Sequence, residues 1–225
     1  GEDNVLLLER SLYGLVTAPN LFYDHLKANL VKRGFKPSPF DPCLFISKKV
    51  ICTVYVDDCL FFAPERQYIN DVIKSLQQEM KLTIEGENLM KFLGMEVKRH
   101  DQNVYELTQP GLIKKVIETT GLSNCKPEFT PAAEAPLGSN ENDDAFNEPW
   151  KYSSVVGMLM YLANTTRPDI SFAVHQAARF SHSPKASHGK AVKQIIRYLA
   201  SSSGKGLIFT ANPEAGLEMY CDADL

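Results

Sequence analysis

The sequence predicts an α+β protein, in which a sheet with helices on one face precedes a mainly helical region. Two observations support this prediction. Up to about residue 98, short apolar runs rich in β-branched residues alternate with segments whose apolar residues repeat at helical spacing. Beyond residue 151 helical spacing dominates, and the intervening residues 131–150 have the composition of a linker.

The N-terminal part of the chain supplies the predicted sheet and its helices. A strand-like run at residues 5–8 precedes a helix that begins near Thr17 and ends near Gly34, residue types common at the two ends of helices. Apolar residues at helical spacing between Ile69 and Met80 predict a second helix. Strands are expected where apolar and β-branched residues run together, at residues 43–46, 50–56, 59–63, 81–84, 92–98 and 104–108.

The rest of the chain is predicted to be largely helical. A short helix at residues 112–119 ends before Gly121. The acidic residues 131–149 are predicted to form a loop or a disordered linker. Three further helices are expected, at residues 152–163, from Pro168 onward and at 188–199, followed by strands at 206–210 and 217–221.

Charge is segregated along the chain, although the formal net charge is only −3. Residues 131–150 hold five acids and no Lys or Arg, whereas residues 185–205 hold five basic residues and no acid. Local blocks of charge matter more for binding than the sum does. The composition therefore does not exclude nucleic acid as a partner.

The composition argues against several other classes of protein. The five cysteines include no Cys-x-x-Cys pair, so neither a disulfide framework nor a zinc site is supported. No apolar run approaches the roughly 18 residues of a membrane span. The first residues lack the basic and apolar parts of a signal peptide. We expect an intracellular, cytoplasmic protein without a membrane partner.

Asp57 and Asp58 are the strongest chemical signal in the sequence. Two adjacent carboxylates between apolar strands are costly unless a cation or solvent takes their charge. Phosphoryl transfer uses such groups, because Mg²⁺ is commonly held by one or two carboxylates and the substrate phosphates. The alternative is an ordinary hairpin turn, in which Asp bonds to nearby backbone. For two aspartates alone the ordinary turn is the better interpretation, but Tyr55, Val56 and a wider pattern of motifs reverse that preference.

The wider pattern is a series of short motifs in a fixed order. They are Ser-Leu-Tyr-Gly-Leu-Val-Thr-Ala-Pro at 11–19, Tyr-Val-Asp-Asp at 55–58, Phe-Leu-Gly-Met-Glu-Val at 92–97, Gln-Pro at 109–110, Cys-Lys-Pro at 125–127, Thr-Pro at 130–131, Tyr-Ser-Ser-Val-Val-Gly at 152–157, Tyr-Leu at 161–162, Thr-Arg-Pro-Asp-Ile at 166–170, Phe-Ala-Val at 172–174 and Arg-Tyr-Leu at 197–199. In order and spacing they resemble the copia-type (Pseudoviridae-like) reverse transcriptases of retrotransposons, over almost the whole chain.

The resemblance implies a domain organisation. Residues 1–100 would be a partial polymerase palm, an antiparallel sheet with helices on one face, and residues 101–130 the start of the thumb. An acidic linker at 131–150 would lead to a helical thumb or connection at 151–204. Residues 205–225 would be the truncated start of an RNase H domain.

The resemblance also assigns roles to residues. Asp57 and Asp58 would be two of three carboxylates that hold two Mg²⁺ (or Mn²⁺) ions for nucleotidyl transfer to a primer end. Asp222 would be the first metal ligand of the RNase H domain. The other roles are nucleotide and template binding by Tyr13, Gly14, Leu15, Tyr55 and Val56, positioning of the primer end by Phe92, Leu93, Gly94 and Met95, and contacts to the nucleic-acid backbone by Lys190, Lys193 and Arg197.

Several of these assignments have structural alternatives. Gly14 could belong to a simple turn before a helix, and Gly94 could mark a bulge in a core strand. Lys190, Lys193 and Arg197 could form a solvated helix face. The nearby pair Arg167 and Asp169 is predicted to be a structural ion pair at a helix start.

The implied partners are an RNA template, a DNA primer and deoxynucleoside triphosphates, within a cytoplasmic virus-like particle. The other parts of the polyprotein, the upstream palm and fingers and the downstream RNase H domain, would be partners too.

The chain departs from the family pattern at several positions. The family usually has Lys-Gln where Val16 and Thr17 stand, a basic residue at Asn20, and tryptophan where the chain has Leu225. The family's first catalytic aspartate lies upstream of residue 1. We therefore expect no primer extension by this chain alone, and two alternatives stay open: an inactive remnant that binds nucleic acid, or a protein-interaction role.

Overall fold

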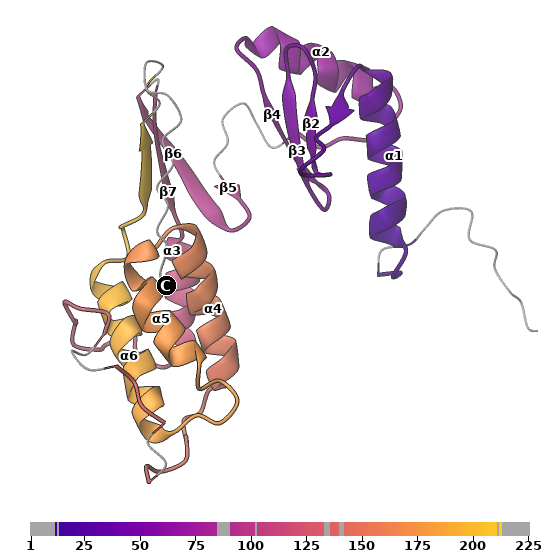
Figure 1. Ribbon diagram of the computed structural model, residues 1–225. Helices are drawn as coiled ribbons and strands as arrows, with labels where there is room; N and C mark the ends of the chain where they lie inside the picture. Colours follow the sequence, from indigo (N-terminus) through magenta and orange to yellow (C-terminus); the bar gives the residue numbers. More distant parts are fainter. Residues whose placement is uncertain are drawn as a thin grey trace, which may run out of the picture. The chain divides into compact units, whose positions relative to one another are not determined.

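The computed structural model consists of two compact units, Gly1–Glu85 and Gly86–Leu225 (Figure 1). It describes residues 12, 14–84, 91–101, 103–132, 136–139, 142–210 and 212. Within these residues each unit contains one antiparallel sheet of four strands together with helices, so the predicted α+β class is confirmed. The strands predicted at residues 5–8 and 217–221 lie outside the described residues.

The first unit has two helices packed on one face of its sheet. The strands β1 (Lys36–Pro37), β2 (Leu44–Ile46), β3 (Ile51–Tyr55) and β4 (Asp58–Phe62) pair in sequence order, and the helices are α1 (Ala18–Lys32) and α2 (Arg66–Gln77). Leu30 of α1 and Leu76 of α2 share a core with Cys52 of β3. Since Phe45 of β2 is the register partner of Cys52 and is buried in the same core, both helices cover one face, as predicted.

The predicted ends of α1 are confirmed in position but not in every contact. The helix begins directly after Thr17, whose side chain makes no capping hydrogen bond. Gly34 follows its C-terminal end with φ of +81°, a conformation that favours glycine. The Gly34 N–H bonds to the carbonyl oxygen of Val31 at 2.9 Å and satisfies one carbonyl of the last turn.

The strand predicted at residues 81–84 is wrong, because this segment follows α2 without regular structure. Leu82 packs against the core of the first unit as its apolar pattern requires. A strand also needs a neighbouring strand to bond its backbone, and within the described residues β4 is paired only with β3. Apolar character alone therefore misassigned a segment that covers the core without joining the sheet.

The second unit combines a sheet with a helical bundle (Figure 1). Its strands β5 (Lys91–Phe92), β6 (Met95–Asp101), β7 (Val104–Thr108) and β8 (Leu207–Thr210) also pair in sequence order. The strand predicted at 92–98 is therefore interrupted by a tight turn between β5 and β6. The last strand, β8, reaches the sheet only after all the helices of this unit.

The helices of the second unit enclose a separate apolar core. They are α3 (Pro110–Thr119), α4 (Tyr152–Thr165), the short 3₁₀ helix η1 (Pro168–Ile170), α5 (Ser171–Ala178) and α6 (Ala186–Ser201). Val116, Leu159, Val174 and Ile196 contribute one fully buried side chain from each of the four α-helices. All four helices were predicted, with bounds that differ by a few residues, and the helix expected from Pro168 onward begins as η1 and continues as α5.

The described part of the acidic linker is a loop that packs on the start of α6. Asp143 Oδ2 accepts the Ser187 backbone N–H at 2.6 Å, and Ala145 forms a β-bridge with Lys185. The ring of Phe146 lies edge-on to the ring of Trp150, with centroids 4.8 Å apart. Of the two predicted alternatives, residues 142–150 are thus a packed loop. No helix among the described residues is long and apolar enough to cross a membrane.

Candidate active site

Asp57 and Asp58 lie at the tip of the β3–β4 hairpin. The two strands pair from Ile51 and Phe62 to Tyr55 and Asp58, which leaves Val56 and Asp57 as a two-residue loop. Both aspartates are exposed, so their charges are solvated. The two strands predicted on either side of these residues are confirmed, and they form a hairpin.

The loop carries backbone strain at Val56. Its φ is +56°, in the left-handed region that a β-branched residue rarely adopts. Two-residue hairpin loops with positive φ at this position usually carry glycine there. The conformation places the Val56 side chain in solvent, 59% exposed, directly before the two carboxylates.

Val56→Gly should raise the free energy of unfolding of the first unit by about 1 kcal/mol, because glycine adopts positive φ without the steric cost. The measurement is amide hydrogen exchange at Cys52 and Val54, whose side chains are buried in β3. Thr53→Gly in the same strand is the control. It should lower stability by about 1 kcal/mol, since glycine in a strand interior weakens it. A destabilised Val56→Gly variant would show that the positive φ carries no strain.

Two thiols share the inner face of this hairpin. Val54, the register partner of Cys59, lies two residues along β3 from Cys52, so the two cysteines are diagonal neighbours on one face. A hydrogen bond to Cys59, together with burial, raises the pKa of Cys52. The same bond lowers the pKa of Cys59, although burial and the negative charges of Asp58 and Asp57 act in the opposite direction.

A second tight turn joins β5 and β6. Phe92 pairs with Met95, and the loop residues Leu93 and Gly94 have φ of +51° and +73°. Positive φ at both loop positions is typical of a type I′ hairpin turn. Tyr161 of α4 donates its hydroxyl to the Leu93 carbonyl oxygen at 2.5 Å, so a helix fixes the tip of this hairpin. Sequence reasoning missed this contact, which spans 68 residues.

The remaining residues assigned to nucleotide binding are only partly described. Gly14 has φ of +96°, and Leu15 beside it is 43% exposed, in a turn before α1. Tyr55 is 56% exposed at the end of β3. Tyr13 and the RNase H candidate Asp222 lie outside the described residues.

Two of the three basic residues of α6, Lys193 and Arg197, are paired within the protein, whereas Lys190 is exposed. Lys193 Nζ lies 2.6 Å from Glu148 Oε1, and Arg197 Nη1 lies 3.0 Å from Glu128 Oε1. Arg197 Nε also donates to the carbonyl oxygen of Lys126 at 2.7 Å. Lys193 and Arg197 therefore do not belong to a fully solvated face, because an acid within the linker and an acid before it pair with them. The opposite charges of linker and helix were visible in the sequence, but their pairing was not.

The linker residue Asp143 interacts with Ser187 and Lys190 of α6, and both residues favour its ionised form. Hydrogen bonds from the hydroxyl and the backbone N–H of Ser187, with a weaker attraction to Lys190, hold the pKa of Asp143 below its ordinary value.

Arg167 and Asp169 form the predicted structural ion pair. Arg167 Nε and Nη2 donate to the two oxygens of Asp169 at 2.9 and 2.7 Å. Arg167 is 1% exposed and also donates to the carbonyl and hydroxyl oxygens of Ser202, just beyond α6. Burial opposes ionisation of Asp169, but the hydrogen bonds from Arg167 and Tyr198 outweigh it and lower the pKa of this carboxyl. Arg167 therefore connects Asp169 of η1 to the end of α6 through hydrogen bonds.

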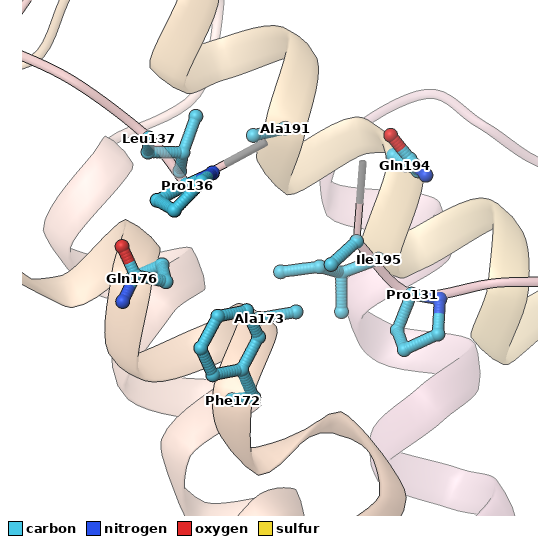
Figure 2. A pocket seen from close by; sticks show the side chains of 10 residues that line it. Pro131, Pro136, Leu137, Phe172, Ala173, Gln176, Ala191, Gln194 and Ile195 are labelled. Atoms are coloured by element: carbon cyan, nitrogen blue, oxygen red, sulfur yellow. The ribbon is translucent and has the colours of Figure 1, made fainter. Parts of the chain in front are cut away.

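The second unit contains a small apolar cavity that lacks the groups of a catalytic site. It has a volume of about 30 Å³ and lies between the linker and helices α5 and α6 (Figure 2). Pro136, Leu137, Phe172 and Ile195 surround it, and none of the described residues that line it is charged. It therefore offers nothing to a phosphate or a metal ion.

The hairpin carboxylates have the donor chemistry of a magnesium site. Asp57 and Asp58 offer adjacent, exposed, hard oxygen ligands, which suit Mg²⁺ and Mn²⁺. Within the described parts of the chain, no group of three or more His, Cys, Asp or Glu residues is placed to hold a metal ion. The pair fits one part of a metal site.

Comparison of the sequence with known proteins identifies the family to which this chain belongs. The family described as "Reverse transcriptase (RNA-dependent DNA polymerase)" matches residues 1–134, which include both hairpins. The chain is 35% identical over 224 residues to the Retrovirus-related Pol polyprotein from transposon RE1 of Arabidopsis thaliana, and 31% identical over 238 residues to that from transposon TNT 1-94 of Nicotiana tabacum. Each alignment covers 98% of this chain, but only 15% and 17% of those polyproteins.

A shorter relative is covered more fully. The putative transposon Ty5-1 protein of Saccharomyces cerevisiae is 28% identical over 225 residues, which are 98% of this chain and 73% of that protein. No solved structure matches. The family match over more than half of the chain, with the relatives from transposons, shows that the chain belongs to the copia-type reverse transcriptases.

Proposed function

We propose that this chain is the palm and thumb part of a polymerase that copies RNA into DNA, with Asp57 and Asp58 as metal-binding catalytic residues. The observation that carries the proposal is the placement of two adjacent, exposed carboxylates at the tip of a hairpin, within the segment that matches the reverse transcriptase family. Two Mg²⁺ ions held there would orient the primer hydroxyl and neutralise charge on the transferred phosphate.

The chain's own residues would then hold the substrates around this turn. Gly14 leaves space for backbone to approach a nucleotide closely, since no described residue other than its chain neighbours has an atom within 4 Å of where its Cβ would be. Tyr55 and Val56 are exposed on the same hairpin as the carboxylates. The turn at Leu93 and Gly94 would support the primer end, held in place by Tyr161. The substrates would be an RNA template, a DNA primer and deoxynucleoside triphosphates.

Asp57→Asn combined with Asp58→Asn should abolish divalent-metal binding at the hairpin, because neutral amides lose the charge that attracts the ion. The measurement is the broadening by Mn²⁺ of the amide resonances of Val56 and Cys59, which flank the aspartates. The unsubstituted chain should show broadening that saturates and that excess Mg²⁺ reverses.

Asp41→Asn together with Asp71→Asn is the matched control. Asp41 lies in a loop and Asp71 in α2, and the pair changes the net charge by the same amount. Broadening at the hairpin should persist in this control. Equal broadening in the unsubstituted chain and in the hairpin variant would count against the proposed site.

The basic residues of α6 are proposed to contact nucleic-acid phosphates, in competition with the acids that they now meet. Lys190, Lys193 and Arg197 can together neutralise about three phosphates, which gives a slope of log affinity against log salt near −2.7 for a duplex. The triple change Lys190→Ala, Lys193→Ala, Arg197→Ala should flatten that slope for a short RNA–DNA hybrid.

A variant that removes the acidic partners of α6 tests the same proposal in the opposite direction. Glu128→Gln with Glu148→Gln removes the carboxylates that pair with Arg197 and Lys193. Both bases then become available, so this variant should bind the hybrid more tightly and with a steeper salt dependence. A slope that neither variant changes means that the ion pairs are structural only.

Binding without catalysis is a second candidate, favoured by Val16. The family usually has lysine there, and the Val16 side chain is 96% exposed, so no described contact within the protein replaces the lost charge. A chain that binds the hybrid with the expected salt dependence, but shows no Mn²⁺ effect at the hairpin, would support this candidate over the polymerase.

A further inference from the structure

Two thiols lie next to each other beneath the tip of the β3–β4 hairpin. Cys52 of β3 and Cys59 of β4 belong to rows of paired residues that are two residues apart along the strands, and both pack in the core that the helices cover. A hydrogen bond joins the two thiols, and neither is part of a disulfide. Since Asp58 directly precedes Cys59, the thiol pair adjoins the proposed catalytic carboxylates without belonging to that site.

The two thiols differ in their access to solvent. Cys52 is fully buried in the core of the first unit, whereas Cys59 is partly exposed. A dissolved reagent can therefore reach Cys59 and not Cys52. In pairs of this kind the accessible sulfur reacts first, and the neighbouring thiol then resolves the product to a disulfide.

A bond between the two sulfurs would move the edge strand of the sheet. Diagonal neighbours in an antiparallel sheet lie about 7–8 Å apart, whereas the Cα atoms of a disulfide are mostly about 5.5–6 Å apart. Among the described strands β4 pairs only with β3, while β3 is held by β2 and β4. Closing the bond therefore displaces β4 rather than β3. Asp57 and Asp58, which directly precede Cys59, move with it.

We propose that a small disulfide such as glutathione disulfide converts Cys52 and Cys59 into a reversible cross-strand disulfide, which displaces the carboxylates at the hairpin tip. First, the sulfur of Cys59 attacks one sulfur of the reagent, forms a mixed disulfide and releases one glutathione as its thiol. The sulfur of Cys52 then attacks the sulfur of Cys59 and releases the second glutathione. The protein thiols lose two electrons and two protons, and the reagent gains both.

The strain of the bond makes it suited to a reversible change. A disulfide that the native backbone has to shift to accommodate is more easily reduced than an unstrained one. Thiols restored by a reductant would let β4 return to its register with β3. The pair is therefore distinct from a disulfide that stabilises a fold.

A third cysteine near this pair serves as an internal control. The carbonyl oxygen of Cys43 accepts the Val54 N–H at 2.9 Å, so Cys43 lies on the other side of β3 from Cys59. Its side chain packs against the same core. Cys43 leads directly into β2, which is paired with β1 and β3 and is less free to move than β4. The cross-link should therefore join Cys52 to Cys59 and not to Cys43.

The unsubstituted chain provides the first test. The reduced chain is incubated with glutathione disulfide, and its cysteines are mapped by mass spectrometry of peptides. The product should contain Cys52 bonded to Cys59, with a mass lower by about 2 Da and no glutathione on either residue. The amide resonances of Asp57 and Asp58 should shift on oxidation and return when dithiothreitol is added.

Alanine variants separate the two steps. Cys52→Ala should lose the cross-link and accumulate glutathione on Cys59, because the first step remains and the second is lost. Cys59→Ala should leave Cys52 unmodified, since that side chain is buried. Cys43→Ala is the matched control, and it should form the cross-link at a rate within about twofold of the unsubstituted chain.

Three results would overturn the proposal. One is a product in which glutathione stays on Cys59 although Cys52 is present, and another is a product in which Cys52 is bonded to Cys43 as often as to Cys59. The third is a cross-link that forms without any shift at Asp57 and Asp58. Failure of the proposed polymerase function leaves this test unaffected, since no step involves a metal ion, and broadening by Mn²⁺ in the reduced chain tests that function separately.

Discussion

Arg167→Met should lower the free energy of unfolding of the second unit by about 3 kcal/mol, which is typical when one partner of a buried charge pair is removed. The methionine fills a similar volume but donates no hydrogen bond. It leaves the carbonyl and hydroxyl oxygens of Ser202 without the guanidinium that they now meet at 2.9 and 2.8 Å. Asp169 keeps Tyr198 as a partner, at 2.7 Å. The measurement is urea unfolding followed by the fluorescence of Trp150, which is buried in the same unit.

Acid provides a second readout of the same ion pair. The pKa of Asp169 is lower in the folded chain than the value of about 3.9 expected when unfolded. Its stabilising contribution is therefore fully present above the unfolded pKa and is lost as pH falls through the lower folded pKa. The stability difference between the unsubstituted chain and Arg167→Met should shrink over that acidic range. A difference that stays constant as Asp169 is protonated would mean that Arg167 acts through packing and its hydrogen bonds to Ser202, and not through the charge of Asp169.

Gly206→Ala should destabilise the second unit by about 3 kcal/mol, at the upper end of the cost of overpacking. A Cβ at Gly206 would lie 2.0 Å from the carbonyl oxygen of Leu107 and 2.7 Å from Cγ2 of Thr108. The first neighbour is backbone and cannot rotate away, so Leu207, which follows Gly206, would be displaced from its pairing with Leu107. Hydrogen exchange of the β7 and β8 amides, with the same urea measurement, would detect this loss.

Gly204→Ala is the matched control, two residues away in the chain. Apart from its chain neighbours, no described residue has an atom within 4 Å of the position of its Cβ, and its φ is not in the left-handed region. Alanine there should be neutral or should stabilise the chain by up to about 1 kcal/mol, because it restricts the unfolded state. Similar losses in both variants would mean that the segment before β8 needs flexibility rather than the absence of a side chain at Gly206.

Local pattern was enough to locate most of the secondary structure. The apolar run that only Asp57 and Asp58 interrupt predicted the β3–β4 hairpin. Two strands can bury the apolar residues while a tight turn between them exposes the two charges. Periodicity located helices such as α4 and α6, because each has a buried apolar stripe. Pattern failed at residues 81–84, where Leu82 is packed against the core but no strand forms. Apolar spacing reports burial, and it does not report hydrogen bonding to a neighbour.

Contacts between distant segments could not be predicted from spacing. Lys193 was placed on the polar face of α6, but its ion pair with Glu148 joins residues 45 apart. The bond from Tyr161 to the turn at Leu93 is likewise invisible until the helix and the hairpin are positioned together. The two aspartates and the turn at Leu93 were both identified by local motifs, whereas the contact of Tyr161 with that turn depends on tertiary packing.

The late position of β8 in the chain bears on the order in which the two units fold during synthesis. All the described pairing of the first sheet is between strands that are consecutive in the chain, and Asp57 and Asp58 are in place once β4 has formed. That unit can fold as it leaves the ribosome, since local contacts form fastest. The second sheet must wait for residues 207–210, so the edge of β7 stays unpaired while the helices are being made. An unpaired edge is a template for other strands, so a ribosome that stalls between α3 and β8 would leave an intermediate prone to aggregation.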